Sequence, residues 1–190
     1  GKGASELLLL GLHRERGLPV SILRPGIVVG KGGQPFHGAV GQFINQQHCL
    51  GWGPGKAPLP FVLVEDVAEA ICLALRSEAA VGRIYNVVGE VRPTAREYIA
   101  ELGAVLGRPL RFHPRQPFGV QAFEISKWLI KRLAGRWSAQ LPSYHHLRSL
   151  GMRARFDCED IQRELGWRPV TDRAEFMRRA IGIFANDRAG

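Results

Sequence analysis

The sequence predicts a parallel α/β protein, and three observations support this fold class. Short apolar segments alternate along the chain with longer segments whose apolar residues recur at helical spacing. Strands separated by helices are typical of parallel βα units. The chain has 190 residues with 45% hydrophobic content, enough to bury a core, which excludes a disordered chain or a small disulfide scaffold.

The first part of the chain predicts helices that alternate with short strands. Gly17 is a typical helix terminator, and Asp66 is a candidate N-cap for a later helix. Glycines and prolines between residues 50 and 60 predict a loop. The expected elements, in order, are a helix around 4–12, a strand over 19–23, a helix over 39–47, a strand over 61–64 and a helix around 67–75.

The second part of the chain predicts helices with clear start signals. Thr94 and Glu97 have the spacing of a capping box, Gly107 ends that helix, and Asp172 with Glu175 repeats the start signal near the end of the chain. The expected elements are a strand over 83–88, a helix over 94–107, a peripheral strand over 110–113, a helix over 157–165 and a helix from 172 toward 185.

The net charge of +9 is unevenly distributed along the chain. Residues 1–106 hold ten basic and nine acidic residues, whereas residues 107–136 hold seven basic residues and one acidic residue. This favours one basic element over a basic fold throughout, and it argues against a nucleic-acid-binding protein. The basic element could be a solvated face, which is the simplest interpretation, a site for substrate phosphates, or an amphipathic helix on an anionic membrane.

The cysteines and histidines indicate no metal site. Cys49, Cys72 and Cys158 are an odd number of cysteines, far apart and without a CxxC pair, which favours a reducing, cytoplasmic setting. The adjacent His145 and His146 would point apart on a helix and could not both bind one metal ion. The sequence has no signal-peptide pattern, and no apolar run reaches the length of about eighteen residues expected of a transmembrane helix.

Two glycine clusters resemble phosphate-binding loops but depart from the motifs. The dinucleotide fingerprint that Gly30 would open needs glycine where Pro35 stands. For residues 51–56, a phosphate loop would need glycine at Leu50 and Ser or Thr at Ala57. We therefore interpret both clusters as turns.

Five segments carry a more specific pattern through their order along the chain. They are Lys2 with Glu6, residues 24–30 (RPGIVVG), 61–70 (FVLVEDVAEA), 84–87 (IYNV) and 164–169 (ELGWRP). Together they resemble landmarks of the extended short-chain dehydrogenase/reductase family, the NAD-dependent epimerase/dehydratase group. The resemblance implies the C-terminal part of a Rossmann-like NAD(P)-binding domain with a parallel sheet over residues 1–107, interrupted by substrate-loop insertions. It also implies a mainly helical substrate-binding region over 108–190.

The resemblance also implies the chemistry. Lys2 matches the lysine of the family's Tyr-x-x-x-Lys motif, whose tyrosine would precede Gly1, so we expect these 190 residues alone to be inactive. An ammonium group near a phenol favours phenolate, which exchanges a proton with a substrate hydroxyl while hydride passes to or from the nicotinamide. Lys2 would also hydrogen-bond the nicotinamide ribose. The segment that would pass beside the nicotinamide comprises Pro25, Gly26, Ile27 and Val28.

The substrate class stays open at this stage. Ile27 and Val29 stand where sugar-nucleotide epimerases commonly have Asn and Tyr, and Leu63 replaces a common His. A nucleotide-sugar or similar hydroxyl-bearing substrate is one expectation, and a 3β-hydroxysteroid dehydrogenase-like reductase is the alternative. Lys56 and Arg108 are candidates for binding substrate phosphates.

The expected cofactor is NAD or NADP, with a small preference for NAD. The expected partners are a small-molecule substrate and a second copy of the chain in a homodimer, with no nucleic acid and no metal. A further alternative is a non-catalytic dinucleotide-binding scaffold that docks to a membrane or a protein through residues 120–136, which would make the cytoplasmic protein membrane-peripheral.

Overall fold

The computed structural model of the chain describes residues 1–115, 125–130, 132 and 156–189. The chain divides into two compact units. Unit 1 comprises Gly1–Gln34, Pro60–Arg92 and Arg155–Ile183, and unit 2 comprises Pro35–Leu59, Pro93–Ala154 and Phe184–Gly190. The units are therefore interleaved along the chain.

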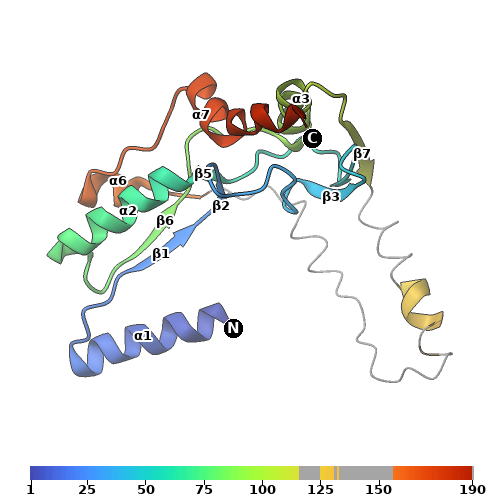
Figure 1. The fold of residues 1–190 in the computed structure, drawn as a ribbon. Coiled ribbons are helices and arrows are strands. Elements are labelled where there is room, and N and C mark those ends of the chain that lie inside the picture. The colour runs from blue at the N-terminus through green and yellow to red at the C-terminus, as the bar shows by residue number, and fades with distance from the viewer. Residues whose placement is uncertain (116–124, 131, 133–155, 190) are drawn as a thin grey trace. The chain divides into compact units, whose positions relative to one another are not determined.

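Unit 1 contains two pairs of parallel strands flanked by helices (Figure 1). Strand β1 (Ile22–Pro25) pairs with β6 (Ile84–Val87), and β2 (Ile27–Val29) pairs with β5 (Phe61–Leu63). In Figure 1, α1 (Lys2–Arg16) and α2 (Val64–Arg76) lie on opposite sides of the β1–β6 pair. The remaining elements of unit 1 are η1 (Glu78–Ala80), α6 (Glu159–Leu165) and α7 (Arg173–Ala180). The last element, η2 (Gly182–Ala189), begins in unit 1 and continues into the residues assigned to unit 2. The predicted parallel α/β fold is confirmed.

The core of unit 1 brings the region after α6 against the strands. The side chains of Trp167, Tyr85 and Phe61 are almost fully buried. The indole Nε1 of Trp167 donates a hydrogen bond to the backbone oxygen of Asp66 at 2.9 Å, so the polar edge of the buried ring is satisfied. Gly166 ends α6 in the left-handed conformation, at φ 69°. The predicted end of this helix at residue 165 is thus confirmed.

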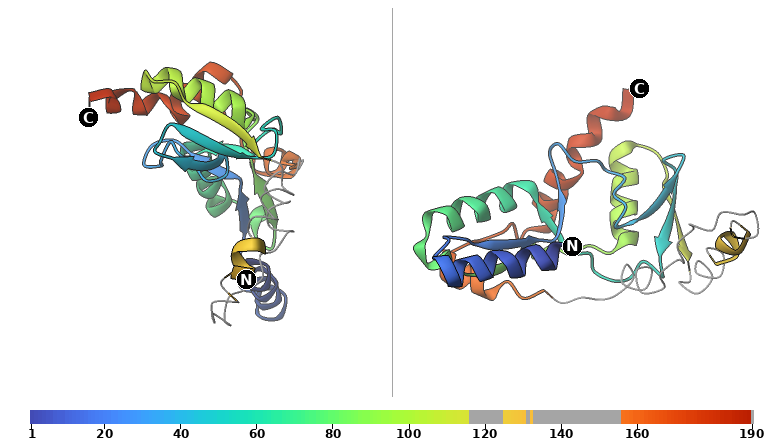
Figure 2. Two further views of the ribbon diagram at one scale, coloured as in Figure 1. Left: turned by 90° about the vertical axis from the view of Figure 1, so that its right-hand side faces the viewer. Right: turned by 90° about the horizontal axis from the view of Figure 1, so that it is seen from below.

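Unit 2 contains a three-stranded mixed sheet with the strand order β3-β4-β7. Strands β3 (Gly41–Ile44) and β4 (His48–Trp52) are antiparallel, and β7 (Arg111–Arg115) pairs with β4 in parallel. Helix α3 (Ala95–Leu106) precedes β7 and contacts it (Figure 2). The peripheral strand predicted near residues 110–113 is therefore β7.

The helix predicted over residues 39–47 is wrong, because this segment forms the first half of a hairpin. Val40, Phe43 and Ile44 have helical spacing, but Asn45 and Gln46 adopt φ values of 49° and 52°. Two consecutive positive φ values form a type I′ turn, which joins antiparallel strands. Long-range pairing of β4 with β7 overrides the local helical pattern, so the loop predicted from residue 50 begins only after Trp52.

The predicted helix ends are mostly confirmed. Gly17 and Gly107 terminate α1 and α3 in the left-handed conformation, and Thr94 with Glu97 forms the capping box of α3. Asp172 caps α7 by accepting a hydrogen bond from the Glu175 backbone at 2.7 Å. Strand β1 occupies residues 22–25, two residues later than the predicted 19–23 at its end.

Asp66 is not the N-cap of α2. The helix begins two residues earlier at Val64, so Asp66 lies in its first turn and is 5% exposed. Its carboxylate accepts a hydrogen bond from the Val170 backbone at 3.2 Å, while burial raises its pKa. Asp66 therefore connects the start of α2 to the segment that follows Trp167.

The basic element predicted from residue 120 to 136 lies largely outside the described residues. Within it, residues 125–130 are helical. Among the described helices, none combines the length and the apolar character that crossing a membrane requires.

Candidate functional site

The candidate site lies at the carboxyl end of β1, where the chain exchanges one strand partner for another. The Gly26 amide donates to the Val87 carbonyl oxygen at 2.9 Å, and the Ile27 amide donates to the Pro60 carbonyl oxygen at 2.7 Å. Hydrogen bonding to the end of β6 therefore stops at Gly26, and hydrogen bonding to the segment that leads into β5 begins at Ile27. In open α/β sheets, ligands bind in the crevice outside the carboxyl ends of the strands.

Gly26 is required by the packing of the backbone at this crossing. A Cβ atom at this position would lie 2.2 Å from the carbonyl oxygen of Pro60 and 3.2 Å from Cγ2 of Val88. Gly26 thus has a role in strand packing, whether or not the segment passes beside a nicotinamide. Because the amides of Gly26 and Ile27 are both bonded within the protein, any contact of this segment with a carboxamide would use its other backbone groups.

The remaining residues of the segment alternate between the surface and the core. Pro25 is exposed, Ile27 is half-buried and Val28 is 37% exposed, whereas Val29 is buried. Val29 therefore anchors the segment, and the side chains of Pro25 and Val28 are accessible to a ligand of unit 1.

Helix α1 is attached to the end of β1 by an ion pair. The Arg24 Nε atom lies 3.2 Å from both carboxylate oxygens of Glu6, and the Nη2 atom makes a closer contact with Oε2. The hydrogen bonds from Arg24 lower the pKa of Glu6. Lys2 and Glu6 lie four residues apart and therefore share one face of α1. The ion pair joins this face to Arg24, the residue immediately before Pro25.

Lys56 and Arg108 belong to unit 2, so the structure divides the predicted site residues between the two units. The Arg108 Nη2 atom donates to the side-chain oxygen of Gln46 at 3.1 Å, and its guanidinium lies 5.9 Å from the centre of the Phe36 ring. Lys56 is exposed in the loop after β4.

The glycine clusters have structural roles. The Gly33 amide donates to the Gly30 carbonyl oxygen at 3.0 Å, which closes a turn after β2 as predicted. In unit 2, a Cβ on Gly51 would lie 2.0 Å from the ring of Phe112, and one on Gly55 would lie 2.4 Å from it. These glycines make room for an aromatic ring, which supports the choice against a phosphate loop.

A histidine pair in unit 2 was missed by the sequence analysis. The Nδ1 atom of His48 lies 2.9 Å from the Nε2 atom of His113, with the ring centres 5.1 Å apart. The two residues are 65 positions apart, and only the register of β4 with β7 brings them together. Among the described residues, no group of three or more His, Cys, Asp and Glu side chains could hold a metal ion.

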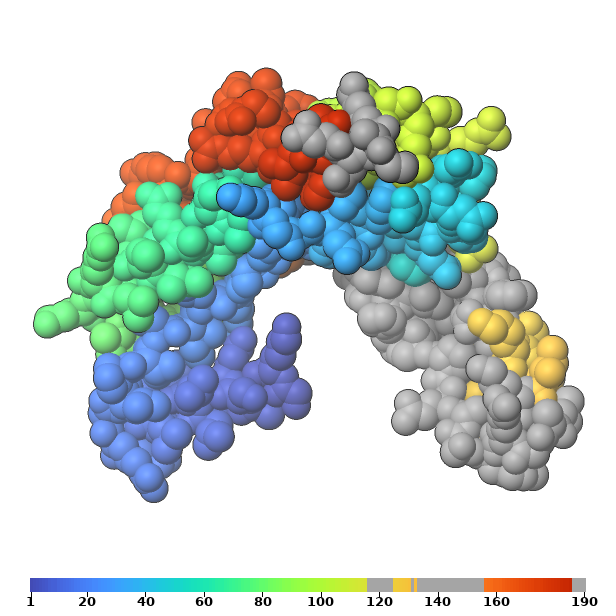
Figure 3. Space-filling view, viewed as in Figure 1, coloured from blue at the N-terminus to red at the C-terminus, as the bar shows by residue number. Residues whose placement is uncertain are grey.

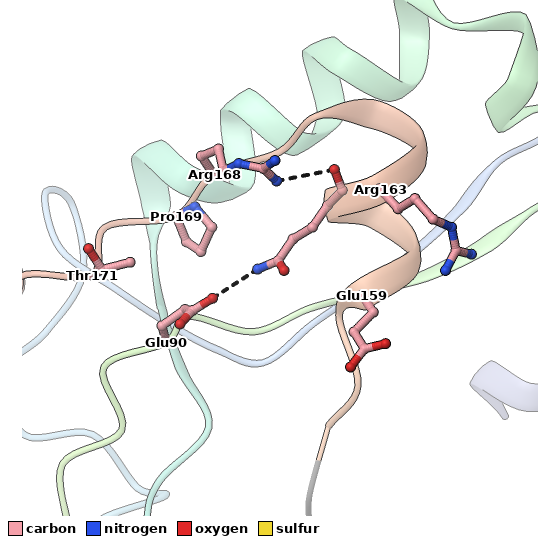
Figure 4. Close-up of a pocket in the computed structure, with 7 residues that line it drawn as sticks. Glu90, Glu159, Arg163, Arg168, Pro169 and Thr171 are labelled. Carbon is pink, nitrogen blue, oxygen red and sulfur yellow. Dashed lines mark hydrogen bonds between the residues drawn. The ribbon is translucent and has the colours of Figure 1, made fainter.

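A charged pocket of about 590 Å³ in unit 1 is a further feature that could bind a ligand (Figure 4). The side-chain amide of Gln162 donates to Glu90 at 2.9 Å, and Arg168 donates to the Gln162 backbone oxygen at 3.2 Å. In Figure 4 the guanidinium of Arg163 points away from Glu90. These polar groups bind one another and do not converge on a common point, so the pocket shows no arrangement for a reaction.

Comparison with known proteins confirms the resemblance predicted from the sequence. Residues 1–88 match the NAD dependent epimerase/dehydratase family. A curated relative, (4-alkanoyl-5-oxo-2,5-dihydrofuran-3-yl)methyl phosphate reductase of Streptomyces griseus, is 46% identical over 87 residues, which are 40% of this chain and 30% of that protein.

Solved structures extend the likeness to the fold of nearly the whole chain. The dTDP-glucose 4,6-dehydratase DesIV of Streptomyces venezuelae, with NAD bound, is 23% identical at a TM-score of 0.65 over 98% of this chain and 50% of that chain. The UDP-glucuronic acid 4-epimerase of Bacillus cereus is 16% identical at a TM-score of 0.64 over 96% and 50%. RMD of Pseudomonas aeruginosa, complexed with NADPH, is 19% identical at a TM-score of 0.62 over 98% and 54%. The chain thus has the fold of about half of each of these proteins.

Proposed function

We propose that this chain, whose residues 1–88 match the NAD dependent epimerase/dehydratase family, is the C-terminal part of an NAD(P)-dependent oxidoreductase that acts on a hydroxyl-bearing small molecule. The observation that carries the proposal is the Glu6–Arg24 ion pair, which holds the Lys2 face of α1 to the end of β1. The ion pair thereby links the helix that carries Lys2, one residue of the proposed catalytic pair, to the proposed cofactor segment, Pro25 to Val28.

The residues of the chain fit one side of a nicotinamide site. The segment from Pro25 to Val28 stands at the carboxyl end of a parallel strand, with accessible side chains at both of its ends. A bound nicotinamide supplies hydride transfer. The Lys2 ammonium would hydrogen-bond the nicotinamide ribose and lower the pKa of a tyrosine phenol contributed from before Gly1, so that the phenol oxygen exchanges a proton with the substrate hydroxyl.

The relatives support a reductase more than a nucleotide-sugar epimerase. The Streptomyces griseus relative, at 46% identity, is named as a reductase of a phosphate ester, whereas the nucleotide-sugar enzymes with this fold are at most 23% identical among those described above. The departures at Ile27, Val29 and Leu63 agree with that preference. We therefore favour oxidation or reduction of a small hydroxyl-bearing or carbonyl-bearing substrate over epimerisation of a nucleotide-sugar. Homodimer formation and the preference for NAD remain predictions.

Nicotinamide turnover by the full-length protein tests this proposal. We expect Lys2→Ala to lower kcat about a hundredfold, because the tyrosine that exchanges the proton would lose the ammonium group that lowers its pKa. The matched control is Arg16→Ala, which removes a positive charge from the other end of α1 and should leave kcat within about twofold of the wild type. Wild-type turnover in the lysine variant would contradict the role of Lys2. Cofactor binding without any turnover would favour the non-catalytic scaffold.

A further inference from the structure

Helix α1 lies on the surface of unit 1, and polar contacts help to hold it there. None of its residues is buried, and Figure 3 shows the helix, in dark blue, as part of the molecular surface. Near the end of the helix, His13 packs against Gly82, since a Cβ atom on Gly82 would lie 2.6 Å from the His13 Nε2 atom. In the first half of the helix, Glu6 forms an ion pair with Arg24 of β1. The position of the turn that carries Lys2 therefore depends on this ion pair.

The alternation of side chains along β1 directs Arg24 toward α1. Successive residues of a strand point to opposite faces of a sheet. Leu23 packs against a core cluster that includes residues of α2, so Arg24 points to the other face, where α1 lies (Figure 1). The partner of Glu6 thus belongs to the strand that leads directly into the proposed cofactor segment.

The guanidinium of Arg24 engages both carboxylate oxygens of Glu6. Its Nε atom lies 3.2 Å from each oxygen, and its Nη2 atom also contacts Oε2. A planar guanidinium matches a carboxylate with two parallel donors, whereas the ammonium of a lysine acts as a point charge. The hydrogen bonds from Arg24 lower the pKa of Glu6, so this residue is a carboxylate throughout the neutral range.

Glu6 is also placed to pair with Lys2. The two residues are four positions apart on α1, a spacing at which Cβ atoms lie about 5–6 Å from each other. No other acidic residue occurs between Gly1 and Arg14 in the sequence. Within the part of the chain that the structure describes, Lys2 is exposed and makes no ion pair. The Glu6 carboxylate therefore has two cations within reach, and the structure shows it bound to Arg24.

A Lys2 ammonium bound to Glu6 would serve the proposed site poorly. The charge of the carboxylate would compensate that of the ammonium, which would then stabilise a phenolate less. The hydrogen-bond donors of the ammonium would also be turned toward Glu6 and away from a nicotinamide ribose. Arg24 removes this competition, because its own charge compensates the carboxylate.

We propose that Arg24 is a positioning residue of the site, which binds the Glu6 carboxylate and thereby leaves the Lys2 ammonium free to act on the nicotinamide ribose and the catalytic phenol. The inference rests on the proposed function, because it assumes the role given there to Lys2. An ion pair that only attached α1 to β1 would behave differently, since loss of either partner would then have the same effect.

Substitution of each partner in the full-length protein separates these two roles. We expect Arg24→Gln to lower kcat about tenfold, because Glu6 is released to compensate Lys2, whereas Glu6→Gln should lower it by no more than about threefold. Adding Glu6→Gln to Arg24→Gln should restore kcat to the level of Glu6→Gln alone. Equal losses in the two single variants, with no recovery in the double variant, would show that the pair only attaches α1 and would overturn the inference.

The ion pair of Arg83 with Glu164 in unit 1 provides a matched control. The side chains of Arg24 and Arg83 are 50% and 48% exposed, and those of Glu6 and Glu164 are 23% and 20% exposed. Arg83→Gln should leave kcat within about twofold of the wild type, because this pair shares no residue with the helix that carries Lys2. A loss as large as that of Arg24→Gln would attribute both effects to stability and would overturn the inference.

Zero-length crosslinking detects the competing contact without any turnover. A water-soluble carbodiimide joins a carboxylate to an amino group that touches it, forming an amide. In the cofactor-free full-length protein, we expect Arg24→Gln to raise the yield of the Lys2–Glu6 amide at least about threefold, as measured by peptide mass spectrometry, because residues at this helical spacing are neighbours. Arg83→Gln should give the wild-type yield. The same yield in the wild type and in Arg24→Gln would overturn the inference.

Failure of the inference and failure of the proposed function give different results. If Lys2→Ala keeps wild-type turnover, or if the full-length protein has no turnover, the proposed function fails together with the positioning role of Arg24, while crosslinking still shows which cation Glu6 prefers. If Lys2→Ala loses turnover and Arg24→Gln keeps it, the role of Lys2 stands and the inference alone fails.

Discussion

Unit 1 and the sheet of unit 2 use charged residues in opposite ways. In unit 1, Glu6, Glu164 and Glu175 each contact guanidinium groups, and the hydrogen bonds from those arginines lower the pKa of each carboxyl, that of Glu175 to about 2. The sheet of unit 2 has no carboxylate of its own, while Arg111 and Arg115 project from one face. Charge in unit 1 therefore links separate segments through Glu6 and Glu164, whereas Arg111 and Arg115 make no ion pair with the described residues.

The glycines show a second difference between the units. Gly26 in unit 1 lies against the backbone of Pro60, which cannot move without disturbing a strand pair. Gly51 in unit 2 lies against the ring of Phe112, a side chain that can change its rotamer. A side chain at position 26 would thus be excluded by backbone atoms, whereas a side chain at position 51 would be excluded by the ring of Phe112.

The largest predicted effect follows from the crossing at Gly26. Gly26→Ala places a methyl group 2.2 Å from the Pro60 oxygen, so the strands must separate or the backbone must distort. We expect the free energy of unfolding to fall by about 3 kcal/mol or more. Chemical denaturation monitored by circular dichroism measures this loss.

Gly11→Ala provides the control for that experiment. Gly11 lies within α1, and a Cβ atom there would meet nothing within 4 Å. Alanine should stabilise the helix by up to about 1 kcal/mol, because it has the higher helix propensity. Equal effects of the two substitutions would contradict the assignment of Gly26 to backbone packing.

The next effect concerns the acidic network of unit 1. Glu164 accepts hydrogen bonds from Arg83 and from the Tyr85 hydroxyl, the latter at 2.8 Å, and these bonds lower its pKa. A lowered folded-state pKa contributes stability above the ordinary glutamate pKa of about 4.3, and this stability is lost as the pH falls through the folded-state value. We expect Glu164→Gln to destabilise the protein near neutral pH, with the difference from the wild type shrinking in acid.

Unfolding curves recorded across the acidic range measure that difference. Glu159→Gln, on the exposed first turn of the same helix, serves as the control and should change stability little at any pH. A difference between Glu164→Gln and the wild type that stays constant down to acid would show that the charge of Glu164 does not stabilise unit 1.

The same contrast explains which parts of the fold the sequence could predict. In unit 1, local signals such as Gly17 and the Asp172 cap specify the ends of helices within a few residues, and these predictions are confirmed. In unit 2, the hairpin depends on pairing between β4 and β7, which lie more than fifty positions apart. The sequence analysis predicted a helix over residues 39–47, although Asn45 is a residue type that accepts positive φ.

The candidate sites follow the same rule. Lys2, Glu6 and the segment from Pro25 to Val28 were found from motifs, because each is a contiguous pattern in the sequence. The ion pair of Glu6 with Arg24 and the contact of His48 with His113 could not be predicted from the sequence. In each pair, the fold alone brings together two residues that are far apart along the chain. Burial of Asp66 was missed because an acidic residue at a helix start is usually an exposed cap.

The smallest predicted effect tests the one part of unit 2 that local signals do specify, the start of α3. The Thr94 hydroxyl accepts a hydrogen bond from the Glu97 backbone at 3.3 Å, and the Glu97 carboxylate accepts one from the Thr94 backbone at 2.7 Å. Thr94→Ala removes the first of these bonds, and we expect a loss of about 1 kcal/mol in the free energy of unfolding. Hydrogen exchange should quicken at the first amides of α3 while the amides of α7 in unit 1 stay protected. Glu97→Gln preserves the capping pattern and should cost less. Because α3 precedes and contacts β7, faster exchange that spread into β7 would show that this locally specified helix also supports the strand carrying Arg111 and Arg115.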